Sequence, residues 1–124
     1  AKFLMSHPKV ERVSHPSVAS DIAKERADKY LSGGCGGLMG FEIKGGIEAG
    51  KQFINSLEMF YHVANIGDSR SLAIHPASTT HSQLNEEELL SAGVTTGYIR
   101  LSIGLEHLDD IKDDLSQALD KVSV

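Results

Sequence analysis

One arginine in a short apolar segment is the residue of this chain whose chemistry best suits ligand binding. Residues 98–104 (YIRLSIG) alternate as a β-strand does, with Ile99, Leu101 and Ile103 on one face. Arg100 therefore points to the opposite face. Its guanidinium presents a rigid fork of donors that matches a carboxylate or a phosphate. The strand predicts an anion-binding site, and the alternative is a solvent-facing arginine on a one-sided sheet.

A second segment, residues 45–52 (GGIEAGKQ), matches a phosphate-binding loop only in part. Its glycines and Lys51 fit the pattern, but Gln52 stands where a Ser or Thr hydroxyl has to reach magnesium. An apolar stripe at helical spacing begins at Ile47 and includes Gly50. We therefore expect a helix here and no nucleotide site.

Cysteine and histidine give no catalytic or metal site in this sequence. The glycine-rich segment 33–37 lacks the dinucleotide fingerprint, because Met39 stands where that pattern requires a glycine. As a nucleophile, Cys35 would need a histidine base delivered by the fold. His75 and His81 lie six residues apart, a spacing that matches no common zinc site. We expect a histidine here to be hydrogen-bonded to backbone in a turn.

The elements that position these residues form a mixed series. Strands are expected at 10–13, 38–44, 60–66 and 98–104, a short extended segment at 71–74, and helices at 21–30, 47–57, from residue 86 behind the N-cap Asn85, and 108–119. The strands are short and the helices between them few. This order predicts a two-layer α/β (α+β) fold with a mixed, largely antiparallel sheet of about four strands and helices packed on one face.

Length and composition set the class of protein. A chain of 124 residues corresponds to one domain, residues 1–124. The net charge is −5 and the basic residues are scattered, which argues against nucleic acid or an anionic membrane as the partner. No apolar run approaches the ~18 residues of a membrane span. The single cysteine fits a reducing cytoplasm.

The order of several motifs resembles a known family. The motifs are GGLMGFEIKGG at 36–46, NIGD at 65–68, SL at 71–72, HPASTTHSQL at 75–84 and IRLSIGLE at 99–106. This series resembles the C-terminal small domain of the fold-type I, pyridoxal-phosphate-dependent enzymes of cysteine and methionine metabolism. The segments 65–68 and 75–84 are most similar to the O-acetylhomoserine sulfhydrylase branch. Cystathionine γ-synthases and methionine γ-lyases share the Thr-His and Arg-Leu-Ser elements and remain an alternative.

The resemblance implies a transferase of methionine biosynthesis that replaces the acetoxy group of O-acetylhomoserine, released as acetate, by sulfide or a thiol to give homocysteine or methionine. It implies that Arg100 binds the α-carboxylate of this amino-acid substrate, and that Ser71 and the backbone at Leu72 help to hold the same group. Thr80 and His81 are expected to be structural. The sequence departs mildly from the family at Cys35, at Ser69, and at Gly40, where serine is frequent.

The resemblance also implies groups that lie outside this chain. The family's cofactor lysine, the aspartate paired with the pyridinium nitrogen and the phosphate-binding loop belong to a preceding N-terminal domain. None of the eight lysines here lies in a segment that resembles the cofactor lysine's motif. We therefore expect no catalytic or cofactor-binding residue, no pyridoxal phosphate binding and no activity in the isolated chain. The full-length protein is expected to be a cytoplasmic homotetramer. A free-standing, non-catalytic carboxylate-binding module is the second hypothesis.

Overall fold

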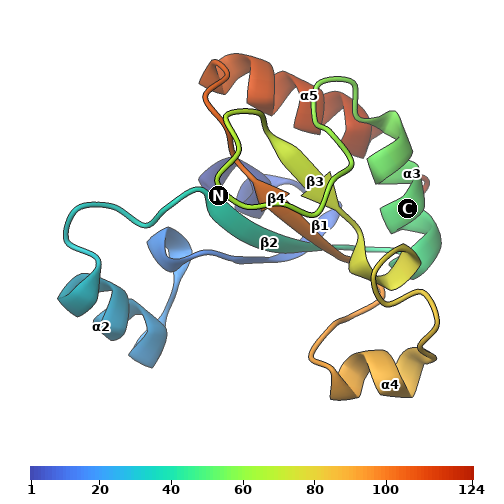
Figure 1. Ribbon diagram of the computed structural model, residues 1–124, viewed down its shortest axis with the longest axis horizontal. Coiled ribbons are helices and arrows are strands. Elements are labelled where there is room, and N and C mark those ends of the chain that lie inside the picture. Colours follow the sequence, from blue (N-terminus) through green and yellow to red (C-terminus); the bar gives the residue numbers. More distant parts are fainter.

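The computed structural model describes residues 1–124 and shows a sheet with helices over one face (Figure 1). The sheet has four strands in the order β1-β2-β4-β3. All three pairs of neighbouring strands are antiparallel, which confirms the predicted largely antiparallel sheet. The strands are β1 (Val10–Ser14), β2 (Leu38–Ile43), β3 (Leu72–Ile74) and β4 (Tyr98–Ser102).

Five α-helices and two 3₁₀ turns complete the fold. The helices are α1 (Lys2–Ser6), α2 (Asp21–Tyr30), α3 (Gly46–Ser56), α4 (Glu86–Ser91) and α5 (Leu108–Asp120), and the turns are η1 (Pro16–Val18) and η2 (Pro76–Ser78). α3 and α5 pack together over the sheet, whereas α2 and α4 project from the body (Figure 1). None of the helices combines the length and the apolar character that a membrane span requires.

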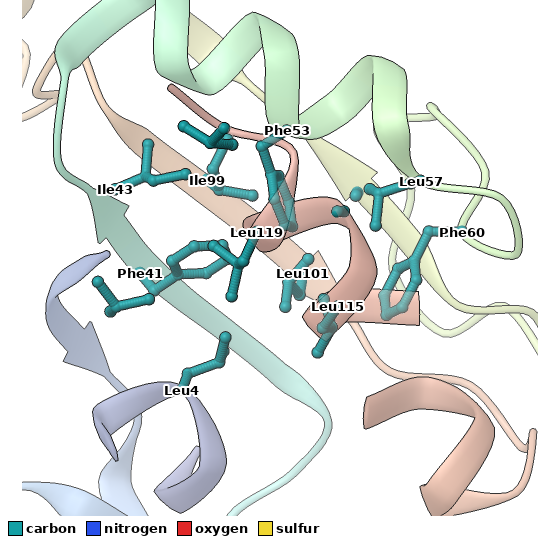
Figure 2. Close-up of a cluster of buried hydrophobic side chains, with 14 of the residues drawn as sticks. Leu4, Phe41, Ile43, Phe53, Leu57, Phe60, Ile99, Leu101, Leu115 and Leu119 are labelled. Atoms are coloured by element: carbon teal, nitrogen blue, oxygen red, sulfur yellow. The ribbon is translucent and has the colours of Figure 1, made fainter. Parts of the chain in front are cut away.

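The core lies between one face of the sheet and the helices α1, α3 and α5 (Figure 2). The ring of Phe41 on β2 meets the ring of Phe53 on α3 edge to face, with the centroids 5.3 Å apart. Ile99 and Leu101 on β4 are both fully buried in this core. Because its two neighbours point into the core, Arg100 points to the face that these helices leave open.

Two helix starts follow from local sequence. The side chain of Asn85 accepts a hydrogen bond from the Glu88 backbone, and the Glu88 side chain accepts one from the Asn85 backbone, which makes a capping box. α3 begins at Gly46, directly after Gly45 in a left-handed conformation with φ of 101°. Gly50 is therefore buried inside a helix, and residues 45–52 form no phosphate-binding loop.

The prediction of a strand at 60–66 is wrong. Only Tyr61 pairs, in one parallel bridge with Leu72. Its backbone N–H donates to the oxygen of Ser71 at 3.0 Å, and its carbonyl accepts from the N–H of Ala73 at 2.8 Å. Beyond this point the chain leaves the edge of β3, and residues 62–66 are exposed with no strand to pair with. The five-residue helix α1 was not predicted, because it is short and has no side-chain cap.

Candidate functional site

Arg100 lies in a concavity between α2 and the open face of the sheet. The strand register places Gly40 opposite Arg100 and Glu42 opposite Tyr98, so these four residues share that face. Twenty residues line the concavity, which has a volume of about 1040 Å³. Arg100 is half-buried among them. Its side chain is accessible to a ligand that enters from this side.

The charge of Arg100 is not balanced within the chain. Arg12 on β1, which also lines the concavity, is paired, with Nε at 2.9 Å from Oε2 of Glu42. In contrast, no carboxylate oxygen lies within 4.0 Å of the Arg100 guanidinium. A guanidinium carries five N–H donors, and half-buried donors need acceptors. The arrangement can bind a carboxylate or a phosphate.

Tyr98 occupies the space that a side chain at position 40 would fill. A Cβ atom at Gly40 would lie 2.5 Å from Cε2 and Cζ of Tyr98, and closer still to its hydroxyl oxygen. The ring therefore lies over β2, at the position opposite Arg100. This contact explains sterically why position 40 is glycine in this chain, whereas serine is frequent there in the family that the chain resembles. Sequence reasoning did not identify Tyr98, because its contact with Gly40 depends on the register of two strands.

Ser71 and Leu72 lie at the start of β3 and do not line the concavity. Both are buried, with 0% and 1% of their surface exposed. The backbone N–H and the hydroxyl of Ser71 donate to Oε1 and Oε2 of Glu106, each at 2.6 Å. The Ser71 hydroxyl also accepts from the Gly104 N–H at 2.9 Å. The structure thus engages Ser71 within the chain, and its contact with substrate stays a prediction.

Glu106, which follows β4, links this strand to the start of β3 through its hydrogen bonds with Ser71. Sequence reasoning did not assign Glu106 this role. Burial raises the pKa of Glu106, but hydrogen bonds from Ser71 lower it by more, so the pKa lies below its ordinary value. A Cβ atom at Gly104 would lie 2.5 Å from the carbonyl carbon of Arg70 and 2.6 Å from the nitrogen of Ser71. The backbones approach as closely as only glycine permits. An acid two residues after a glycine at a strand end is the available sequence signal.

The two histidines of segment 75–84 bond to different groups. His75 is 1% exposed, with Nε2 at 2.7 Å from the Thr96 oxygen and Nδ1 at 2.8 Å from the Ser78 hydroxyl. Burial lowers the pKa of His75. The bond to Thr96 confirms the prediction of a histidine bound to backbone. His81 Nδ1 lies 2.8 Å from the Thr80 hydroxyl, a local contact on the surface.

The residues around Arg100 lack one group that a pyridoxal phosphate site needs. Enzymes hold this cofactor through a lysine, and no lysine lines the concavity. Two lysines are fixed elsewhere. Lys9 Nζ donates to three carbonyl oxygens at the end of α5, at 2.7 to 3.0 Å, and Lys44 Nζ donates to the oxygen of Pro8 at 2.7 Å. Arg100 therefore lies in a concavity that has no lysine for such a cofactor.

Comparison with known proteins gives consistent matches along the whole chain. The family described as Cys/Met metabolism PLP-dependent enzyme matches residues 1–120. O-acetyl-L-homoserine sulfhydrylase of Leptospira meyeri is 54% identical over 123 residues, which are 98% of this chain and 28% of that protein. O-acetyl-L-homoserine sulfhydrylase 1 of Thermus thermophilus is 49% identical over 96% of the chain and 28% of its own length. L-methionine gamma-lyase of Fusobacterium nucleatum subsp. polymorphum is 44% identical over 98% of the chain and 30% of its own length.

A solved structure has the same fold. It is a Campylobacter jejuni protein named as an O-acetylhomoserine (thiol)-lyase, and its crystals contain N'-pyridoxyl-lysine-5'-monophosphate. The TM-score is 0.86 at 48% identity, and the match covers 97% of this chain and 28% of that one. The chain therefore spans less than a third of the length of these relatives. By sequence and by fold, this chain belongs to the family of pyridoxal-phosphate-dependent enzymes of Cys/Met metabolism.

Proposed function

We propose that this chain forms the wall of an O-acetylhomoserine sulfhydrylase active site that binds the substrate carboxylate. The observation that carries the proposal is Arg100, half-buried in a concavity and without an acidic partner in the chain. The α-carboxylate of an amino acid fits the two parallel donors of a guanidinium. The names of the relatives at 54% and 49% identity support O-acetylhomoserine as that amino acid.

We propose that residues 1–124 are the C-terminal, substrate-binding domain of a longer polypeptide. The coverage of 28% of the sulfhydrylase relatives and the absence of a lysine beside Arg100 support this. The remaining part would hold pyridoxal phosphate, which supplies an electron sink for the loss of acetate from O-acetylhomoserine. We also propose, from the resemblance, a cytoplasmic homotetramer for the full-length protein.

In this proposal the start of β3 assists Arg100. The register pairs Leu72 with Ser102, which lies on the same face as Arg100 and two residues after it. The bonds between Ser71 and Glu106 fix this part of the backbone. Leu72 would then present its backbone to the substrate from the β3 side of Arg100, outside the concavity that α2 lines.

The function is tested by comparing substrates of the full-length protein loaded with pyridoxal phosphate. We expect O-acetylhomoserine with sulfide or a thiol to give homocysteine or methionine with the highest kcat/KM. The relative named L-methionine gamma-lyase supports a second candidate, elimination from methionine. A higher kcat/KM for that elimination, or for cystathionine formation from an acyl-homoserine and cysteine, would reassign the enzyme within the family.

The isolated chain tests the placement of the cofactor. We expect that 1–124 mixed with pyridoxal phosphate develops no visible absorption of a bound cofactor and shows no turnover, because no lysine lines the concavity. A bound-cofactor band would contradict this. If the full-length protein also shows neither cofactor binding nor turnover, yet binds carboxylates through Arg100, the hypothesis of a non-catalytic module holds instead.

A further inference from the structure

Tyr98 stands beside Arg100 on the open face of the sheet, and its hydroxyl has no hydrogen-bond partner in the chain. We propose that Tyr98 is a specificity-determining residue, whose phenol donates a hydrogen bond to the carboxylate that Arg100 binds. The inference rests on the proposed function of Arg100 and names a second group at the same site. It applies to substrates with an anionic α-carboxylate, as opposed to their amides and esters.

The position of the Tyr98 hydroxyl follows from two strands. Tyr98 lies two residues before Arg100 on β4, so the two side chains leave the same face at a separation of about 6–7 Å. Gly40 on β2 is the direct neighbour of Arg100 across the sheet. The ring of Tyr98 leans toward this neighbour, because its hydroxyl end fills the place of a Gly40 side chain. The phenol therefore lies over β2, at the residue directly opposite Arg100.

The chemistry of the two groups is complementary. An ionised carboxylate has two oxygens and about four acceptor sites, and a bidentate arginine occupies only part of them. A phenol O–H can fill a further one. Because Gly40 leaves room for the ring and β2 supports it, Tyr98 is held in place before a ligand arrives. Little side-chain entropy is then lost on binding.

A packing role for Tyr98 makes a different prediction from a hydroxyl role. If the ring only covers Gly40, phenylalanine is an equal replacement. If the phenol binds the substrate carboxylate, Tyr98→Phe removes one hydrogen bond to a charged group, which corresponds to about 10-fold or more in substrate affinity. The step to be measured is binding, so KM should change and kcat should not.

The experiment uses the full-length protein loaded with pyridoxal phosphate, with O-acetylhomoserine and its α-carboxamide analogue as substrates. For Tyr98→Phe we expect KM for the carboxylate substrate to rise about 10-fold or more, with kcat within about twofold. The preference for carboxylate over carboxamide should fall as well, because the phenol bonds an ionised oxygen more strongly than a neutral amide oxygen. In an Arg100→Ala background, Tyr98→Phe should change KM by less than about threefold, because the carboxylate is no longer held there.

Position 40 provides a second, independent variant. Gly40→Ala should displace the Tyr98 ring and reduce the carboxylate preference as Tyr98→Phe does. In a Tyr98→Ala background the same substitution should have no further effect, since nothing is left to displace. Melting temperature and the cofactor absorption band check that each variant is folded, and if Gly40→Ala does not fold, Tyr98→Phe alone decides.

The outcomes separate this inference from the proposed function. A KM within twofold of wild type and an unchanged carboxylate preference for Tyr98→Phe overturn the role of the phenol. If Arg100→Ala then still lowers kcat/KM strongly, the proposed function stands and only Tyr98 is removed from the site. A weak effect of Arg100→Ala would remove both.

Discussion

Replacing Glu106 by glutamine should loosen the junction between β4 and β3. The carboxylate accepts two hydrogen bonds from Ser71, both at 2.6 Å, a distance typical of a charge-assisted bond from a hydroxyl and short for one from a backbone N–H. Hydrogen bonds to charged groups contribute about 1.5–3 kcal/mol each. Glutamine keeps one acceptor oxygen but turns an NH₂ group toward the other donor. Because Glu106 is only half-buried, we discount the sum and expect Glu106→Gln to lower the free energy of unfolding by about 1.5–3 kcal/mol.

Urea unfolding of the 124-residue chain, followed by circular dichroism, measures this difference. Glu11→Gln is the matched control, because Glu11 is exposed on β1 and forms no ion pair, and its effect should stay within about 0.5 kcal/mol. Ser71→Ala breaks the same contact from the other side. The double variant should therefore be less destabilised than the sum of the single variants, by about 1 kcal/mol.

The stabilisation of the fold by the Glu106 carboxylate should depend on pH. The pKa of Glu106 is lower in the folded chain than its ordinary value of 4.5, so the carboxylate stabilises the fold fully above that value. This stabilisation is lost as the pH falls through the folded pKa. The difference between wild type and Glu106→Gln should shrink over that range. A Glu106→Gln effect as small as that of Glu11→Gln, or strict additivity with Ser71→Ala, would refute the role assigned to this contact.

Two further predictions concern the support of the site, and both are measured by urea unfolding. Asp114 on α5 is 6% exposed and accepts hydrogen bonds from three successive backbone N–H groups that follow α3, at 2.9, 2.9 and 3.2 Å. Asp114→Asn should destabilise the chain by about 2–4 kcal/mol at neutral pH. The control is Asp113→Asn at an exposed position, which should cost less than about 0.5 kcal/mol. Equal effects of the two substitutions would show that the hydrogen bonds of Asp114 do not stabilise the fold. Gly50→Ala places a Cβ atom 2.7 Å from Cε1 of the buried His75, so it should destabilise by about 1–3 kcal/mol, although alanine favours helices. A stabilising Gly50→Ala would show that the histidine ring can move aside.

The sequence predicts those parts of the fold in which one local signal is sufficient. Alternation in 98–104 places Arg100 on the open face, because burying one side of a strand decides both faces. Asn85 starts α4 through contacts within four residues. The segment 60–66 shows the limit, because an apolar run does not reveal whether a strand edge is free to pair with it. In the structure the edge of β3 accepts only Tyr61.

The same limit applies to the candidate site. Arg100 could be identified from residue type and alternation alone. The contact of Tyr98 with Gly40 depends on how β2 and β4 are aligned, and the contact of Glu106 with Ser71 depends on how β3 meets β4. Strand register is set by the packing of the whole sheet, so the sequence of either strand alone does not predict it.

The measurement that tests the central claim most directly is kcat/KM for O-acetylhomoserine in the full-length protein with Arg100→Ala. Loss of a bidentate, charge-assisted contact of about 2–4 kcal/mol should lower kcat/KM by roughly 30- to 1,000-fold. Arg26→Ala removes an exposed positive charge of α2 from the same concavity and should change it by less than about threefold. If Arg100→Ala also stays within threefold of wild type, Arg100 does not bind the substrate carboxylate.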